Sequence, residues 1–261
     1  MADVYLQRDQ PPGVPPLQLT GERTLPDVPE ENYWFRRHLV VYEWIAAQVG
    51  GRRVVDLACG EGYGSAVLAC GGARSVVGVD ANLEAFEHAR LKYGGSGRGP
   101  TFERTMIELW DGDVDCAVFL QTIEHVQDPD AVMARLRELV GPDGVAFVST
   151  PNVLTLAPEG AERSGNPWHV KEYRGTEYRA LCERHFGRVA LHGLLHARRL
   201  RAHQWAIEHA KWDAVHARLG ITRPFYERFT PAISVRDFAL EHEGGRRGLD
   251  RALDFVAVLR P

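Results

Sequence analysis

The sequence predicts an α/β fold in which helices cover both faces of a mainly parallel sheet. Two observations support this prediction. Short apolar runs alternate with helical stretches through the first 150 residues, which is the pattern of a parallel sheet with crossover helices. A glycine-rich turn directly follows the first apolar run, and an acidic residue closes the second, as in folds that bind nucleotides at the carboxyl ends of their strands.

The chain opens with a segment rich in proline, glycine and aspartate, and we expect residues 1–18 to form a flexible tail. A single domain then covers residues 19–261. Its first helix spans 33–49, because aromatic and aliphatic residues recur there at three- and four-residue spacing and Gly50 follows them.

The alternation that defines the sheet comes next. Four apolar runs have the length of buried strands, at residues 54–57, 75–80, 115–120 and 145–148. Helical stretches lie between them, at 63–70, 83–93 and 131–140. Short apolar runs can also be pieces of a buried helix, but the regular alternation and the bounding glycines favour strands.

After Pro151 the alternation stops, and a loop rich in glycine, proline, glutamate and serine spans 153–167. We expect a helix at 177–185, a strand at 189–195, a long helix at 197–219 and a last strand at 252–258. The segment from about 197 to 248 is then an insertion before the last strand, and we expect it to form a helical cap over the substrate.

Composition restricts the class of protein. The net charge is −4, yet residues 151–261 carry 18 Lys and Arg against 13 Asp and Glu. That bias is weak for a nucleic-acid binder, which usually has a dense basic stripe. The four cysteines show no metal-ligand spacing, and we find neither a bilayer-spanning run nor a secretory signal. We therefore expect a cytoplasmic protein without a membrane partner; a homodimer remains an open alternative.

The turn after the first strand predicts a cofactor site. Glycines at 60, 62 and 64 allow a sharp turn and a close approach to a ligand. Asp80 lies 20 residues after Gly60, at the spacing where a carboxylate accepts hydrogen bonds from ribose hydroxyls. Together these features predict a cofactor that contains a nucleoside. NAD and S-adenosylmethionine both fit this geometry, although a dinucleotide fingerprint would read G-x-G-x-x-G.

The pattern D-x-x-C-G-x-G-x-G at 56–64 instead resembles the first motif of class I S-adenosylmethionine-dependent methyltransferases. The resemblance continues through residues 77–80, 123–126 and 144–152. It implies the Rossmann-like fold of that class, with a mainly parallel seven-stranded sheet, helices on both faces and S-adenosylmethionine as cofactor.

The resemblance also implies roles for individual residues. Gly60 and Gly62 would contact the methionine part of the cofactor, and Asp80 its ribose. Either Arg36 or Arg37 would clamp the carboxylate through a charge-assisted bond. The full predicted cofactor set is Arg36, Arg37, Asp56, Ala58, Gly60, Gly62, Asp80, Ala81, Met106, Ile107 and Gln121, with Met106 and Ile107 flanking the adenine.

The fourth strand ends next to Glu124 and His125, which topology places beside the methyl donor. A hydroxyl acceptor must lose its proton, and histidine is the usual base near neutral pH; the alternative is that His125 caps the next helix or bonds to the backbone. Small-RNA 2′-O-methyltransferases and ubiquinone-pathway O-methyltransferases carry a similar Glu-x-x-Glu-His, and the RNA enzymes add a histidine that His169 matches. There these residues hold a divalent cation. We therefore predict Glu124, His125 and His169 as catalytic residues and as ligands of Mg²⁺ or Mn²⁺, with Gln121 in place of the first Glu.

The flanking segments 19–27, 31–38, 166–169 and 193–196 look like those of actinobacterial sugar methyltransferases of the methylglucose lipopolysaccharide and methylmannose polysaccharide pathways. The resemblance implies a sugar or oligosaccharide substrate that is methylated on a hydroxyl in the biosynthesis of a polymethylated polysaccharide. Candidate aromatic and polar side chains for such a site are Trp168, Tyr173, His192, His196 and Trp205. The alternatives are an RNA 2′-O-methyltransferase, another small-molecule O-methyltransferase, and a cofactor-binding protein without catalysis.

Overall fold

The computed structural model describes residues 5–21, 23–95, 97, 99–158 and 160–261. Its strands form one sheet in the order β3-β2-β1-β4-β5-β8-β6-β7. The strands are β1 (Arg53–Leu57), β2 (Ser75–Val79), β3 (Thr101–Glu103), β4 (Cys116–Leu120), β5 (Val145–Pro151), β6 (Arg188–His196), β7 (Phe238–His242) and β8 (Asp254–Arg260). Strands β3 to β5 pair in parallel, whereas β8 pairs antiparallel with both β5 and β6.

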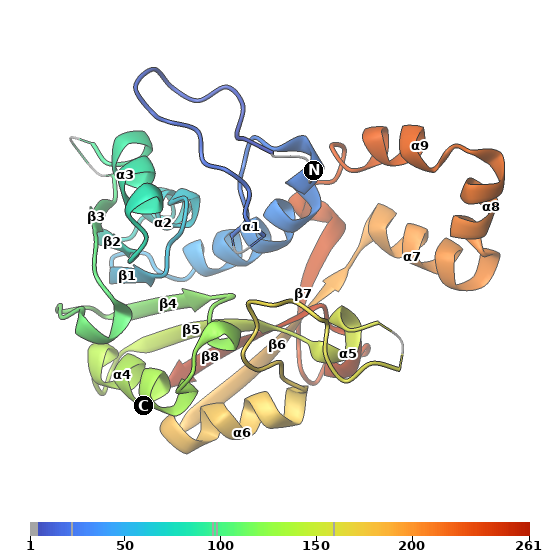
Figure 1. Cartoon of the computed structure of the whole chain (residues 1–261). Helices are drawn as coiled ribbons and strands as arrows, with labels where there is room; N and C mark the ends of the chain where they lie inside the picture. Colours follow the sequence, from blue (N-terminus) through green and yellow to red (C-terminus); the bar gives the residue numbers. More distant parts are fainter. Residues whose placement is uncertain (1–4, 22, 96, 98, 159) are drawn as a thin grey trace.

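Helices lie on both sides of this sheet (Figure 1). They are α1 (Asn32–Ala46), α2 (Tyr63–Cys70), α3 (Leu83–Lys92), α4 (Pro129–Val140), α5 (Val153–Leu156), α6 (Gly175–His185), α7 (Arg198–Ala210), α8 (Trp212–Leu219) and α9 (Thr222–Phe229). Five short 3-10 helices complete the described part: η1 (Pro29–Glu31), η2 (Ile107–Leu109), η3 (Ile123–His125), η4 (Val235–Asp237) and η5 (Leu249–Arg251).

Two apolar clusters hold the layers together. On one face, α4 and α6 bury side chains such as Leu136 and Leu181 against β1, β4 and β5. On the other face, Ile45 of α1 and Leu68 of α2 pack against the same strands. Strands buried on both faces read as continuous apolar runs, which explains why the sequence signalled β1, β4 and β5 so strongly.

The sheet has eight described strands, and the predicted count of seven misses β7. This strand comes from within the predicted insertion and pairs antiparallel with β6 at the edge of the sheet. Its sequence, Phe-Ala-Leu-Glu-His, is short and ends in polar residues, so it lacks the apolar run by which the other strands were predicted.

The long helix predicted at 197–219 is wrong, because it is two helices that meet at Lys211. This residue has a φ of +49°, a backbone conformation that ends a helix and that L-residues seldom adopt. Helices α7, α8 and α9 together form an arch that projects from one end of the sheet (Figure 1), which we call the helical arch, residues 198–229. Its chain then returns to the body, where the Asn32 side chain donates hydrogen bonds to the carbonyls of Thr230 (2.8 Å) and Ile233 (2.9 Å).

The N-terminal segment makes defined contacts. Residues 1–4 lie outside the described residues, but from residue 5 the chain loops across α2 and α3 (Figure 1). The Gln7 amide donates to Glu61 at 3.0 Å, and Leu17 and Leu25 are buried. The flexibility of residues 1–18 stays a prediction; the structure shows that this segment has partners on the domain.

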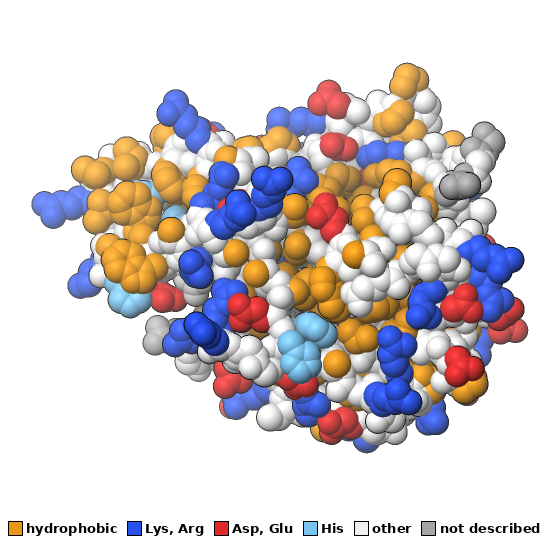
Figure 2. Space-filling model, turned by 180° about the vertical axis from the view of Figure 1, so that it is seen from behind, with side chains coloured by type: hydrophobic (Ala, Val, Ile, Leu, Met, Phe, Trp, Pro, Cys, Tyr) orange, Lys and Arg blue, Asp and Glu red, His pale blue; other side chains and the backbone are white. Residues whose placement is uncertain are grey.

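The outer surface of the arch mixes apolar and basic side chains, as the end of the molecule at the left of Figure 2 shows. Trp205 is 58% exposed and Leu219 is 63% exposed. Among the described residues, no helix has the length and apolar character that crossing a bilayer requires.

Candidate functional site

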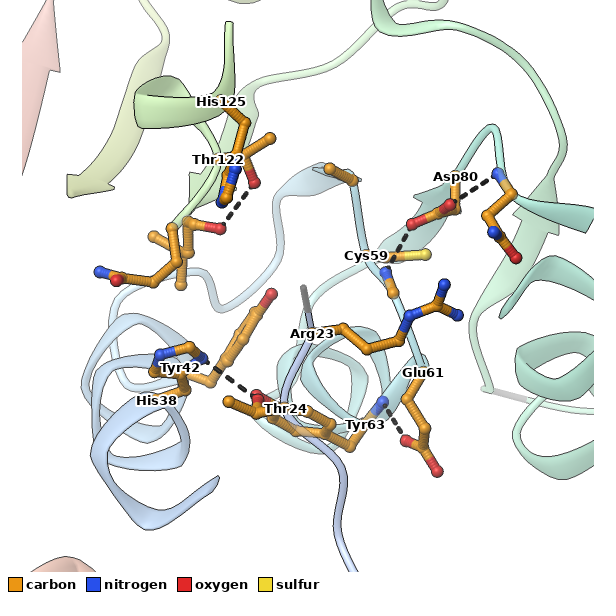
Figure 3. Close-up of a pocket in the computed structure, with 15 residues that line it drawn as sticks. Arg23, Thr24, His38, Tyr42, Cys59, Glu61, Tyr63, Asp80, Thr122 and His125 are labelled. Atoms are coloured by element: carbon orange, nitrogen blue, oxygen red, sulfur yellow. Dashed lines mark hydrogen bonds between the residues drawn. The ribbon is translucent and has the colours of Figure 1, made fainter. Parts of the chain in front are cut away.

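The carboxyl ends of β1, β2 and β4 open onto a cavity of 240 Å³, here called the glycine-turn cavity (Figure 3). Of the residues predicted to bind the cofactor, Ala58, Gly60, Asp80 and Gln121 line it. This is the edge of the sheet at which ligands bind in open α/β folds.

A left-handed backbone shapes the turn. Ala58 and Gly60 have φ values of +54° and +56°, which brings the Gly60 amide 2.8 Å from a carboxylate oxygen of Asp80. The other oxygen of Asp80 accepts from the amide of Asn82, also at 2.8 Å. These bonds fix the Asp80 carboxylate at the cavity wall, so its position does not depend on a ligand.

Two other predicted residues support the turn from behind instead of lining the cavity. Asp56 is fully buried and accepts hydrogen bonds from Ser65 Oγ (2.7 Å) and Tyr42 Oη (3.1 Å). Burial raises the pKa of Asp56 to about 7. A Cβ on Gly62 would approach the Ala89 side chain to 2.7 Å, so Gly62 is required for packing against α3.

The remaining members of the predicted cofactor set lie away from this cavity. Arg37 is buried and its guanidinium donates to both carboxylate oxygens of Asp254, with Nε at 2.7 Å. Arg36 donates to the Asn32 side chain at 3.1 Å. Neither arginine lines the glycine-turn cavity, because Arg37 bonds to β8 and Arg36 bonds within α1. Ala81, Met106 and Ile107 do not line the cavity either, and Met106 is 53% exposed.

Sequence reasoning missed the residues that close the cavity from the opposite side. Arg23 and Thr24 come from the N-terminal segment, and His38 and Tyr42 from α1 (Figure 3). The Thr24 hydroxyl lies 3.2 Å from His38 Nδ1 and 3.0 Å from Tyr63 Oη. The i, i+4 spacing of the two α1 residues was a usable signal, whereas nothing local indicated where Arg23 would lie.

A second cavity, of 250 Å³, adjoins the first and is here called the histidine cavity. Its own wall includes Glu31, Trp34, Glu124 and His169. Five residues line both cavities: Arg23, Thr24, His38, Gln121 and His125. The two cavities therefore meet at the end of β4, where His125 faces both.

The structure brings the three predicted catalytic residues together. One ligand atom from each of Glu124, His125 and His169 lies within 4.8 Å of the others, although His169 is 44 positions from His125. The two imidazole rings are 5.0 Å apart, edge to face.

Hydrogen bonds on the outer nitrogens orient both histidines. His125 Nδ1 lies 2.9 Å from the carbonyl oxygen of Trp168, to which it donates. His169 Nδ1 lies 2.7 Å from a carboxylate oxygen of Glu172. This is the arrangement in which histidines usually bind metals, with the other nitrogen held by a carbonyl or carboxylate. On the other side of the His169 ring, Nε2 lies 3.1 Å from the Asn166 side-chain nitrogen, whose amide donates to it.

Glu124 is buried and joins the loop after β5 to the reaction site. Its side chain accepts from Thr150 Oγ1 at 3.0 Å, and its carbonyl accepts from the amides of Val170 (2.8 Å) and Lys171 (3.1 Å). Burial raises the pKa of Glu124 to about 8. A carboxylate in such a place is stabilised by a nearby positive charge, which a cation would supply.

The aromatic and polar residues suggested for a sugar site separate in space. Trp168 is 49% exposed and adjoins the histidine cavity through its carbonyl bond to His125. Tyr173 is buried in the core, and the ring of His192 on β6 packs against Trp44 of α1. Trp205 faces outward from the helical arch. His196 lies under the arch, in a third cavity.

Comparison with known proteins decides the family. A model described as a methyltransferase domain matches residues 32–218 of this chain, which is more than half of it. The chain belongs to the methyltransferase domain family. A protein of Mycobacterium tuberculosis named a probable S-adenosylmethionine-dependent methyltransferase is 36% identical to this methyltransferase over 252 residues, covering 94% of this chain and 90% of the relative. The predicted type of enzyme, an S-adenosylmethionine-dependent methyltransferase, is thereby confirmed.

Other relatives share parts of the methyltransferase or its fold. A ubiquinone biosynthesis O-methyltransferase of Aromatoleum aromaticum is 34% identical over 161 residues, covering 54% of this chain and 66% of the relative. Among solved structures, an S-adenosylmethionine-dependent methyltransferase of Archaeoglobus fulgidus superposes with a TM-score of 0.56 at 13% identity, covering 88% and 94% of the two chains. The predicted Rossmann-like methyltransferase fold is confirmed.

Proposed function

We propose that this methyltransferase transfers a methyl group from S-adenosylmethionine to a hydroxyl group of a saccharide. The observation that carries the proposal is the junction of the two cavities. The glycine-turn cavity has the features of a nucleoside site, the histidine cavity holds proton acceptors and candidate metal ligands, and His125 lines both.

The cofactor would be held by the residues that line the glycine-turn cavity. Asp80 is fixed at the spacing and edge where a carboxylate accepts from ribose hydroxyls. Arg23 is the cationic side chain of that wall, so we assign to it the clamp on the methionine carboxylate that the sequence suggested for Arg36 or Arg37. When bound, S-adenosylmethionine supplies an electrophilic methyl group.

The chain's own residues would activate the acceptor. A sugar hydroxyl is a poor nucleophile until its proton leaves, and two arrangements of this site could remove it. Either the Nε2 lone pair of His125 accepts the proton, or a divalent cation bound by Glu124, His125 and His169 acidifies the hydroxyl. The second arrangement would require the Asn166 amide, 3.1 Å from His169 Nε2, to give up its bond to that nitrogen.

The donor set fits a cation better than a base alone. Imidazole nitrogen and carboxylate oxygen together suit Mn²⁺, and Mg²⁺ less closely. One ligand atom from each of the three side chains lies within 4.8 Å of the others, so these three residues would hold the ion. We therefore propose a cation held by these residues, with adjacent sugar hydroxyls completing its ligands.

The character of the histidine cavity supports a sugar over an RNA. Its wall places Glu31 and Glu124 beside Trp34, a ring that is 38% exposed. Arg23 is the one Lys or Arg among its described lining residues, whereas binding of a phosphate backbone depends on several Lys and Arg contacts. An aromatic face beside polar side chains is the combination that binds sugar rings.

An acceptor panel tests this proposal. Purified enzyme with labelled S-adenosylmethionine would be offered methyl glucoside, methyl mannoside, their oligosaccharides and a short RNA, with and without a chelator. We expect label in a saccharide, loss of transfer with the chelator and recovery with Mn²⁺. Transfer to RNA alone would assign the alternative function. Transfer that the chelator leaves unchanged, with a rate that rises through the pKa of a histidine, would assign the base mechanism.

A further inference from the structure

A third cavity, of 620 Å³, lies beneath the helical arch and is here called the arch cavity. Its wall comes from α1 on one side and from α7 and α9 on the other, with Tyr33, Leu200 and Phe229 among its residues. Its volume is within the range of small-molecule sites. Nothing in the cofactor or reaction sites described above uses it.

The arch cavity adjoins the histidine cavity. Trp34 and Leu156 line both of them. A row of three adjoining cavities, here called the trough, therefore leads from the glycine turn past His125 to the space under the arch. The histidine cavity has 250 Å³ and the arch cavity 620 Å³, so most of the space along the trough lies beyond the reaction point.

The wall of the arch cavity combines ring faces with hydrogen-bonding groups. Tyr33 Oη lies 2.8 Å from His196 Nε2, and Tyr226 Oη lies 3.2 Å from His203 Nε2. These bonds hold the rings in place. Gln204 also belongs to the wall. A ligand with alternating apolar faces and hydroxyl groups matches such a surface, because a tyrosine hydroxyl that already bonds to an imidazole can still accept a hydrogen bond from a ligand hydroxyl.

The floor and the roof of the arch cavity are held to each other. The Asn32 bonds to the carbonyls of Thr230 and Ile233 join the start of α1 to the end of the arch. A site whose walls are fixed before binding costs less to order, so more of its contact energy appears as affinity.

We propose that the arch cavity binds the second and following sugar units of an oligosaccharide acceptor, while the sugar that receives the methyl group occupies the histidine cavity. This inference rests on the proposed saccharide function and specifies its substrate as a chain of at least two units. Binding energy from the remote units then assists the reaction at the first one.

The test compares acceptors of increasing length on the intact enzyme. Methyl glycosides of one, two, three and four units would be assayed for kcat/KM, and their affinity for the S-adenosylhomocysteine-loaded protein would be measured by calorimetry. We expect kcat/KM to rise at least tenfold from one unit to three. Octyl glucoside, a single sugar with an apolar tail, is the comparison ligand. Its kcat/KM should exceed that of the single-unit methyl glycoside by less than the trisaccharide's does.

Two variants of the arch-cavity wall test whether this cavity causes the increase in kcat/KM with acceptor length. Ile207→Trp should narrow the arch cavity and Phe229→Ala should remove one of its rings. Each should reduce the length advantage to less than about threefold while the single-unit glycoside keeps its kcat/KM. Trp205→Ala is the matched control, since this aromatic residue of the same arch is 58% exposed and is not part of the cavity wall. Thermal unfolding checks that each variant is folded. If Phe229→Ala does not fold, the test rests on Ile207→Trp.

The outcomes separate this inference from the proposed function. If single units are methylated as well as chains, the saccharide function stands and the arch-cavity inference is overturned. An equal gain from octyl glucoside, or a length advantage that both cavity variants retain, overturns it as well. If no saccharide of any length is methylated or bound, both proposals are wrong.

Discussion

His169 donates a hydrogen bond from Nδ1 to Glu172, 2.7 Å away and buried with it. The two side chains come from the segment between α5 and α6, and the Asn166 amide lies 3.1 Å from Nε2 on the other side of the ring. Glu172 is also an acceptor for the amide of Ser164 at 2.8 Å. These bonds lower the pKa of Glu172, although its burial opposes them. The carboxylate thus stays charged and keeps the imidazole oriented.

We expect Glu172→Gln to weaken Mn²⁺ binding by about 10- to 100-fold, the usual effect of removing a partner of a metal-binding histidine. Calorimetric titration of Mn²⁺ into the protein would measure it. Glu162→Gln is the control, because Glu162 is exposed on the same loop. Equal affinities in the two variants would show that His169 does not bind a cation in this way.

Asp80→Ala should weaken the binding of S-adenosylhomocysteine by at least tenfold. Each hydrogen bond from a ribose hydroxyl to a carboxylate contributes about 1.5–3 kcal/mol, and alanine removes both acceptors. Calorimetry on the purified variant gives the answer without an acceptor substrate. An unchanged dissociation constant would remove Asp80 from the cofactor site.

A pair of arginine variants distinguishes the two assignments of the carboxylate clamp. Arg23→Met should lower the affinity for S-adenosylhomocysteine, because the Arg23 side chain lines the glycine-turn cavity. Arg36→Met should leave that affinity within about twofold, since Arg36 bonds to Asn32 instead. The reverse result would restore the assignment made from the sequence.

Arg37→Met should destabilise the fold. Its ion pair with Asp254 joins α1 to β8 and is 4% and 1% exposed on its two sides, so the substitution leaves a buried charge unpaired at a cost of about 3–5 kcal/mol. Urea unfolding measures this loss. The double variant Arg37→Met/Asp254→Leu should recover part of it, and failure to do so would mean that the packing of Arg37 under Trp34 matters more than the charge.

Acid should destabilise the protein partly through His38. Burial lowers the pKa of His38 to about 4, whereas an unfolded histidine titrates near 6.5. Between these values the unfolded chain binds the extra proton, so the free energy of unfolding falls as the pH drops from about 6.5 to 4. Over this pH interval, we expect the free energy of unfolding of the His38→Gln variant to fall by about 1–3 kcal/mol less than that of the wild type. Parallel unfolding curves at pH 7 and pH 4.5 test it, and identical pH dependence in both proteins would contradict the assignment.

The parts of the site that the sequence predicted are those fixed by local geometry. Asp80 and Gly60 sit at the ends of adjacent parallel strands, and Glu124 follows a third, so the order of elements alone brings them to one edge. His169 lies far along the chain from Glu124 and His125, and it was predicted to join them only because the resemblance to RNA methyltransferases includes a matching histidine.

What the sequence did not predict depends on contacts between distant segments. Arg37 and Asp254 are 217 positions apart, and no periodicity in either element indicates that they pair. Arg23 reaches the glycine-turn cavity from the N-terminal segment, which is held by Gln7, 3.0 Å from Glu61, and by Asp27, 3.2 Å from Lys92. Such bonds follow from how the whole chain packs, which local propensities do not encode.

The place of the helical arch in the chain has a consequence for how such enzymes diversify. The arch is inserted between β6 and β7, whereas the glycine turn, Asp80 and the Glu124–His125 pair all belong to the first half of the sheet. Under the proposed function, substitutions or length changes in residues 198–229 would therefore alter what covers the acceptor without moving the residues assigned to the methyl donor. Exchanging this one segment between relatives would be an economical route to enzymes that accept new substrates while keeping their chemistry.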